Sequence, residues 1–236
     1  MLFDLLPTRN EIDDAWNYIG EKLYNSKTGL LYDHAVKSEE EFASADECAR
    51  SWPNACGYGT NMDDCMINGG TMLAACVSRY EQEPSDKLAD FTRSLAEGLL
   101  LCAEAAKDPG FIPRGITPRD CKSHYIDSSR DQYTMFVYGL HCYLNSDICT
   151  SAHKKRISDA LVAVAGRAEK NVTAENGYDM LREDGGKTLN TVLWGPELGN
   201  HEMCRLPMIY IAAYEASGDK HWLELYRSLR TEAVIR

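Results

Sequence analysis

Two aspartates begin segments that have the pattern of buried helices, and both are candidates for acid/base chemistry. Asp64 follows Asp63 in the string GYGTNMDDCMINGG, and Asp131 precedes a second apolar run in SSRDQYT. The helix dipole favours the charged form of a carboxylate in a first turn, which suits a base, a nucleophile or an electrostatic stabiliser. Adjacent helix residues point about 100° apart, so only one of Asp63 and Asp64 can face a cavity freely. The register with the apolar residues that follow favours Asp64. The same positions are also typical of simple helix caps, so the pattern leaves both roles open.

The segment 109–134, which contains Asp131 near its end, is locally basic within an acidic protein. Arg114 lies in it between Pro113 and Gly115, and the planar fork of arginine suits a carboxylate. We therefore expect Arg114 to contact an anionic substrate. The competing interpretation is that Arg114 braces the loop by pairing with Asp120 or Asp127. Further candidate substrate contacts here and in the following helix are polar or aromatic: His124, Tyr125, Arg130, Gln132 and Tyr138.

A third polar segment, LWGPELGNHEMCRLP, adds Trp194, His201 and Glu202 as candidate substrate contacts. Trp194 fits either a stacking platform for a sugar ring or an anchor for its loop. Pro207 allows the next helix to begin as late as Leu206, which would leave His201 and Glu202 in the loop. The chain has no HExxH, CxxC, EF-hand, Walker A or GxSxG motif, so the sequence predicts neither a metal nor a cofactor.

Apolar spacing outlines the helices that must position these side chains. Four segments carry one apolar stripe each, as amphipathic helices do: 12–23, 88–102, 157–168 and 222–229. Three more are apolar on nearly every face: 66–77, 135–144 and 206–214. Such helices are predicted to be buried on all sides, and Gly69, Gly70 and Gly139 would let neighbouring helices approach closely.

The two kinds of helix alternate, in a unit that recurs about every 70 residues. Short polar turns close each pair, whereas the long connections 26–62, 109–128 and 173–201 precede each apolar helix. This order predicts an all-α chain, more than half helical, with an inner and an outer layer of helices. The inner helices should start near residues 64, 130 and 203 and gather their N-terminal ends on one face. Strands should be confined to short pairs in loops, first of all in residues 29–36.

Composition narrows the possible partners. The 236 residues carry a formal net charge of −11, which argues against nucleic acid as a partner. No stretch reaches the roughly 18–20 apolar residues that a membrane span needs, and the opening run MLFDLL does not resemble a signal sequence. Nine cysteines without a CxxC pair favour a reducing compartment. We expect a cytoplasmic protein, with a secreted or periplasmic location after signal removal as the alternative; the sequence does not predict the oligomeric state.

Together, the strings GLLYDHAV, GTNMDDCMINGG and SHYIDSSRDQYTMFVYGL and the alternating helices resemble the six-hairpin glycosidase superfamily. Its members have an (α/α)6 toroid and include unsaturated glucuronyl and rhamnogalacturonyl hydrolases. The resemblance implies a glycoside hydrolase that acts on acidic, uronate-containing oligosaccharides, with Asp64 and Asp131 sharing the acid/base chemistry. A polysaccharide lyase on a related toroid would instead use a base such as Tyr133, Tyr138 or His141. A non-catalytic helical-repeat scaffold is the third possibility.

The chain departs from that superfamily in its number of hairpins. It has three hairpins and a leading helix, whereas the superfamily closes a ring of six. We therefore expect residues 1–236 to form a single toroid-type domain, an incomplete (α/α)6 barrel truncated at its C-terminal end, or else an open variant of the fold.

Overall fold

Helices dominate the computed structural model of the protein, which describes residues 7–235. Helix accounts for 57% of these residues and strand for 3%, which confirms the predicted all-α class. The opening run MLFDLL, which bears on the expectation about a signal sequence, lies outside the described residues.

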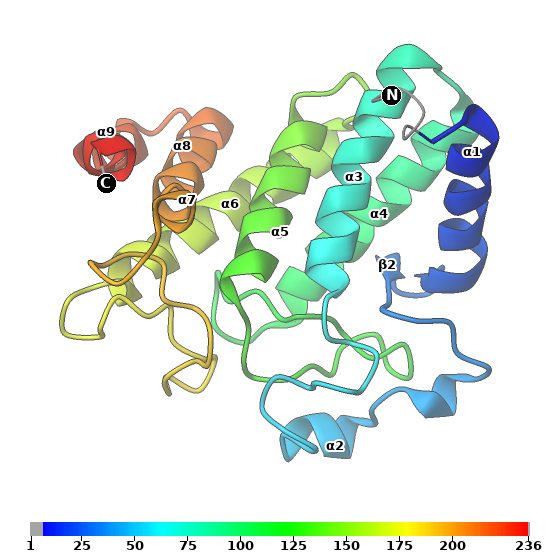
Figure 1. Ribbon diagram of the computed structural model, residues 1–236, viewed down its shortest axis with the longest axis horizontal. Coiled ribbons are helices and arrows are strands. Elements are labelled where there is room, and N and C mark those ends of the chain that lie inside the picture. Colours follow the sequence, from blue (N-terminus) through cyan, green and yellow to red (C-terminus); the bar gives the residue numbers. More distant parts are fainter. Residues whose placement is uncertain (1–6, 236) are drawn as a thin grey trace.

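Three helix hairpins follow a leading helix along the chain (Figure 1). The leading helix α1 (Arg9–Tyr18) continues into a π-helix, η2 (Ile19–Leu23). The hairpins are α3 (Cys65–Gln82) with α4 (Asp86–Ala105), α5 (Arg130–Leu144) with α6 (Ser151–Asn171), and α8 (Arg205–Ser217) with α9 (Lys220–Ile235). Each matches a predicted pair of an apolar and an amphipathic helix.

The remaining elements are short and lie in the connections. They are β1 (Tyr24–Asn25), β2 (Leu30–Leu31), the 3-10 helix η3 (Glu39–Glu41), α2 (Ala45–Ala49) and α7 (Asn200–Met203). The two strands pair antiparallel, with Tyr24 opposite Leu31. A short pair in a loop was predicted, and one of its strands lies inside the expected residues 29–36.

Local signals explain where the helices begin and end. Thr8 caps α1 in a reciprocal capping box with Glu11, while Ser85 and Thr150 accept backbone hydrogen bonds at the starts of α4 and α6. Gly218 ends α8 with a φ of 74°, a left-handed conformation that favours glycine. These caps set the short turns that fold each hairpin back on itself.

The backbones of α3 and α5 touch. A Cβ atom placed on Gly70 would lie 2.0 Å from the carbonyl oxygen of Met135, and one on Gly139 would lie 2.5 Å from the carbonyl oxygen of Gly70. Both glycines are therefore needed for this approach, as their positions in the apolar segments predicted. The contact fixes the relative position of the two helix N-termini.

The inner helices are not buried on every side, which corrects the prediction made from their composition. Thr71 and Ser78 on α3 are exposed, Tyr138 on α5 is 47% exposed, and Met208 and Ile211 on α8 are partly exposed. The described helices form an open two-layer array with α1 and α9 at opposite ends (Figure 1). Each inner helix therefore keeps some residues that its neighbours do not cover.

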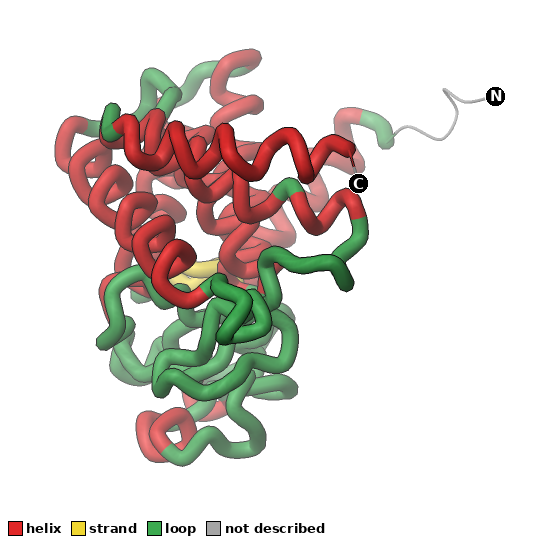
Figure 2. The backbone as a smooth tube through the Cα atoms, turned by 90° about the vertical axis from the view of Figure 1, so that its left-hand side faces the viewer, coloured by secondary structure: helices red, strands yellow, loops and turns green. Residues whose placement is uncertain are grey.

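The long connections gather on one face of this array, at the N-terminal ends of α3 and α5 (Figures 1 and 2). The inner helices begin at Cys65, Arg130 and Arg205, within two residues of the predicted starts. Pro207 lies in the first turn of α8, where its missing N–H costs nothing. Loops on one face of a rigid scaffold are the usual place for a binding site.

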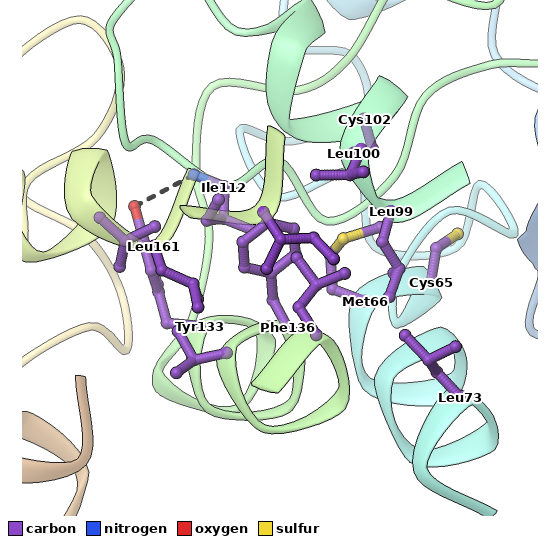
Figure 3. Packing of buried hydrophobic residues seen from close by; sticks show 14 of the residues in the cluster. Cys65, Met66, Leu73, Leu99, Leu100, Cys102, Ile112, Tyr133, Phe136 and Leu161 are labelled. Carbon is purple, nitrogen blue, oxygen red and sulfur yellow. Dashed lines mark hydrogen bonds between the residues drawn. The ribbon is translucent and has the colours of Figure 1, made fainter. Parts of the chain in front are cut away.

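The core lies between the two helix layers and extends under these loops (Figure 3). Met66, Leu99 and Phe136 are fully buried where α3, α4 and α5 meet. Tyr133 joins the loop to the core, because its hydroxyl accepts a hydrogen bond from the backbone of Ile112 at 3.3 Å. All nine cysteines are free thiols. Among residues 7–235, no helix is both long enough and apolar enough to cross a membrane.

Candidate functional site

Asp64 occupies the N-cap position of α3 but its side chain does not cap the helix. Instead, its Oδ1 atom accepts hydrogen bonds from Nε2 of Gln132 at 2.9 Å and from Nη1 of Arg114 at 3.4 Å. The side chain is 47% exposed. The carboxylate is therefore held from the protein side and open to solvent on the other.

Two buried side chains support the backbone beneath Asp64. Nη1 of Arg114 and Nε2 of Gln132 both donate to the carbonyl oxygen of Asp63, at 2.7 and 2.9 Å. Gln132 has no exposed surface, and the Arg114 side chain is 4% exposed. Because both donors serve the Asp63 carbonyl and the Asp64 carboxylate together, they fix the orientation of that carboxylate.

Arg114 has its partners inside the protein. Its Nη2 donates to the hydroxyl of Tyr58 at 2.7 Å, and its guanidinium carbon lies 4.5 Å from the centre of the Tyr58 ring. Neither Asp120 nor Asp127, the partners considered from the sequence, pairs with it. The structure therefore places Arg114 behind the exposed carboxylate, as a positioning residue, with little surface left for a ligand.

Asp33, which sequence reasoning missed, contributes a second carboxylate to this cluster. It follows β2 in the string GLLYDHAV, and its two oxygens accept hydrogen bonds from the backbone of Asp63 at 2.7 Å and from Nδ2 of Asn68 at 3.2 Å. Partial burial, together with the nearby charges of Asp63 and Asp64, raises the pKa of Asp33 above its ordinary value. The signal that could have found it is a lone acid directly after an apolar strand.

Asn61 holds the Asp33 segment against the head of α3. Its side-chain amide donates to the carbonyl oxygen of His34 at 2.9 Å, and its Oδ1 accepts from the backbone N–H of His34 at 2.7 Å. The backbone of Asn61 has a φ of 63°, a left-handed conformation that asparagine tolerates better than most residues. This reciprocal pair brings together two segments about 30 residues apart.

Buried groups also tie the three long connections to one another. The carboxylate of Asp127, fully buried, accepts from the backbone of Ser128 at 2.8 Å and of Leu189 at 3.3 Å. Tyr125 is buried too and donates its hydroxyl to the carbonyl oxygen of Trp52 at 2.6 Å. His124 lies 3.2 Å from a carboxylate oxygen of Glu183. The predicted contacts His124 and Tyr125 thus hold the loops together.

The side chains of Asp131 and Gln132, both in the first turn of α5, point in different directions. Gln132 reaches α3, whereas Asp131 pairs with Arg205 of α8 and its side chain is 57% exposed. Arg130 pairs in the same direction, with Glu202 of α7 at 2.6 Å. The α5 residue that contacts Asp64 is therefore Gln132, and Asp131 lies on the side of α5 that faces α8.

The other predicted contacts are spread over the loop face and the inner helices. Tyr138 lies half-exposed along α5, His201 is exposed on α7, and Trp194 is 8% exposed. Of the candidate lyase bases, Tyr133 is buried, and burial raises its pKa to about 12. His141 pairs with Glu215 of α8.

No protein-family model matches the chain, and comparison with curated proteins and with solved structures likewise gave no match. Within the part of the chain that the structure describes, no group of three or more His, Cys, Asp or Glu side chains could hold a metal ion. The head of α3 holds three carboxylates: Asp33, Asp64 with an arginine and an amide behind it, and Asp63, whose Oδ2 accepts from the backbone of Gly59 at 3.0 Å.

Proposed function

We propose that the chain is a carbohydrate-active enzyme, a glycoside hydrolase, whose acid/base chemistry centres on Asp64 at the head of α3. One observation carries this proposal: Asp64 and Asp33 are neighbouring carboxylates in contrasting environments. Asp64 is exposed and faces the cationic fork of Arg114, whereas Asp33 is partly buried and has a raised pKa. Glycosidases use a carboxyl group with a raised pKa as the acid, beside a second carboxyl that acts as base.

The two carboxyls then have distinct roles. Asp33 donates its proton to the glycosidic oxygen as the bond to the leaving sugar breaks. Asp64, oriented by Arg114 and Gln132, takes a proton from a water molecule as that water bonds to the anomeric carbon. The products are two shorter sugars, and proton exchange with solvent restores both carboxyls.

Asp131 is the alternative partner for Asp64, because the resemblance pairs these two aspartates. Asp131 lies on the side of α5 that faces α8 and pairs with Arg205, whereas Asp33 lies in the same cluster as Asp64. We therefore favour Asp33 as the acid and keep Asp131 as the residue to test against it.

The proposed substrate is an acidic, uronate-containing oligosaccharide. Support for this class comes from the family resemblance and from two arginines near the loop face, Arg130 and Arg205, whose side chains are 25% and 18% exposed. A substrate carboxylate could replace Glu202 on Arg130 in a bidentate pair. A lyase receives less support, because the neighbouring Cys142 thiol and partial burial raise the pKa of Tyr138 and disfavour the deprotonated form that a base requires.

A panel of uronate-containing oligosaccharides, assayed for new reducing ends, tests the proposal. Asp64→Asn and Asp33→Asn should each abolish release, while Asp147→Asn, an exposed aspartate in the turn after α5, should leave it unchanged. If Asp131→Asn abolishes release and Asp33→Asn does not, the assignment of the acid is wrong. Saturable binding without release by the unmodified protein would support a non-catalytic scaffold instead.

A further inference from the structure

A cleft of about 560 Å³ lies between the leading helix and the start of α4. Its walls are α1 and η2 on one side and the α3–α4 turn with the first two turns of α4 on the other. Asp33, Asp64 and the loops around them take no part in it. Its volume is that of a pocket for a small organic molecule, which is typically ~300–1,000 Å³.

Three aromatic side chains form the apolar part of the cleft: Trp16, Tyr24 and Phe91. The guanidinium of Arg79 lies 4.5 Å from the centre of the Trp16 ring. The rings of Tyr24 and Phe91 meet edge to face, with their centres 5.1 Å apart. Aromatic groups held in this way form a rigid apolar surface with little conformational entropy to lose on binding.

The polar groups of the cleft balance one another in charge. Arg79 is paired with Asp13 at 2.7 Å, and Glu83 is paired with Arg9. Among residues 7–235, Glu21 and Lys87 have neither an ion pair nor a side-chain hydrogen bond, and both line the cleft. The charged groups free to bind a ligand are thus one carboxylate and one ammonium, whose charges cancel. The side-chain amide of Asn17, which also lines the cleft without a hydrogen bond to the described residues, adds a neutral donor and acceptor.

The wall formed by the π-helix leaves space for a ligand. π-helical turns are rare and frequently occur at functional sites. Gly20 in this turn lines the cleft, and a Cβ atom placed on it would have no heavy atom within 4 Å. An exposed helical glycine costs roughly 1 kcal/mol relative to alanine. Its presence here keeps the cleft open at some cost in stability.

We propose that this cleft is a second binding site, for a neutral sugar ring or short neutral oligosaccharide. Flat aromatic surfaces accommodate the apolar faces of sugar rings, and Glu21 and Lys87 offer the acceptor and donor that vicinal hydroxyl groups require. An anionic sugar gains nothing from a site whose free charges cancel. The inference does not rest on the proposed hydrolysis, because none of the cleft residues belongs to the Asp64 cluster.

The test is titration of the full chain with cellotetraose, xylotetraose and mannotetraose, in which calorimetry and tryptophan fluorescence measure binding. Tetragalacturonate is the charged comparison. We expect saturable binding of at least one neutral tetrasaccharide. Gly20→Leu should fill the cleft and weaken this binding at least about tenfold without lowering the melting temperature. Trp16→Ala should weaken it similarly. Tyr18→Ala, which removes an exposed aromatic ring from the same helix outside the cleft, is the matched control and should have no effect.

Three results would overturn the proposal. The first is that none of the neutral tetrasaccharides binds, and the second is that their binding survives Gly20→Leu. The third is that tetragalacturonate binds the cleft more tightly than they do. Asp64→Asn should leave neutral binding unchanged, so failure of this site and failure of the proposed hydrolysis can be told apart.

Discussion

The amide nitrogen of Gln132 lies 2.9 Å from Oδ1 of Asp64 and equally 2.9 Å from the carbonyl oxygen of Asp63. One side chain of α5 therefore holds both the backbone and the carboxylate at the head of α3. The contact depends on the close approach of the two helices at Gly70 and Gly139. The packing of α3 against α5 therefore also sets the orientation of Asp64, the proposed base.

Gln132→Met should lower turnover about tenfold while changing the free energy of unfolding by less than about 1 kcal/mol. The stability change is small because Arg114 still serves the Asp63 carbonyl, and because the Oε1 atom of Gln132 is buried without a partner. Initial rates and urea unfolding measure the two quantities. Unchanged turnover would remove Gln132 from the site.

Arg114→Lys should lower the free energy of unfolding by about 2 kcal/mol, because the single ammonium group of lysine cannot reproduce the planar fork of the buried guanidinium. That fork donates to the Asp63 carbonyl and to the Tyr58 hydroxyl at the same time, and lysine would leave one of these oxygens without its donor. Arg119→Lys, an exposed arginine in the same loop, is the control and should be nearly neutral. Weaker binding of acidic sugars with no loss of stability would restore Arg114 as a substrate contact.

Gly70→Ala should destabilise the protein by about 2 kcal/mol or more, because the new methyl group would meet the Met135 carbonyl. Gly166→Ala in α6 is the matched control, since a Cβ atom there meets nothing within 4 Å. That control should stabilise the protein by up to about 1 kcal/mol through helix propensity. Thermal unfolding measures both, and equal effects of the two substitutions would contradict the close helix contact.

Asp33→Asn should raise the melting temperature at pH 7. The pKa of Asp33 is raised in the folded protein, so its contribution to stability is fully present below the ordinary aspartate pKa of 3.8 and is lost as pH rises through the folded value. Asparagine removes the cost of the charged form at neutral pH. The advantage of the variant should therefore shrink as pH falls toward 3.8. A variant less stable than the parent at pH 7 would contradict the raised pKa.

Much of the fold could be predicted because its signals are local. The spacing of apolar residues located every hairpin, and Gly70 and Gly139 indicated the close helix contact. Exposure of the inner helices could not be predicted in this way, because it depends on which neighbours cover each face, and an apolar composition does not contain that information.

The site was less predictable because its contacts join distant segments. Asp64 was found from its place before an apolar helix, but Asp33 reaches it through a loop contact that Asn61 holds. The partners of Arg114 likewise come from residues 50 or more positions away. Residue type predicted a carboxylate partner for Arg114, in the substrate or at Asp120 or Asp127, whereas the carboxylate that it contacts in the structure is that of Asp64.

Release of new reducing ends from uronate-containing oligosaccharides, measured for the unmodified protein beside Asp64→Asn and Asp147→Asn, tests the central claim most directly. The account predicts release by the unmodified protein and by Asp147→Asn, and none by Asp64→Asn in a variant that remains folded. Release that persists undiminished in Asp64→Asn, or no release by the unmodified protein from any member of the panel, would contradict it.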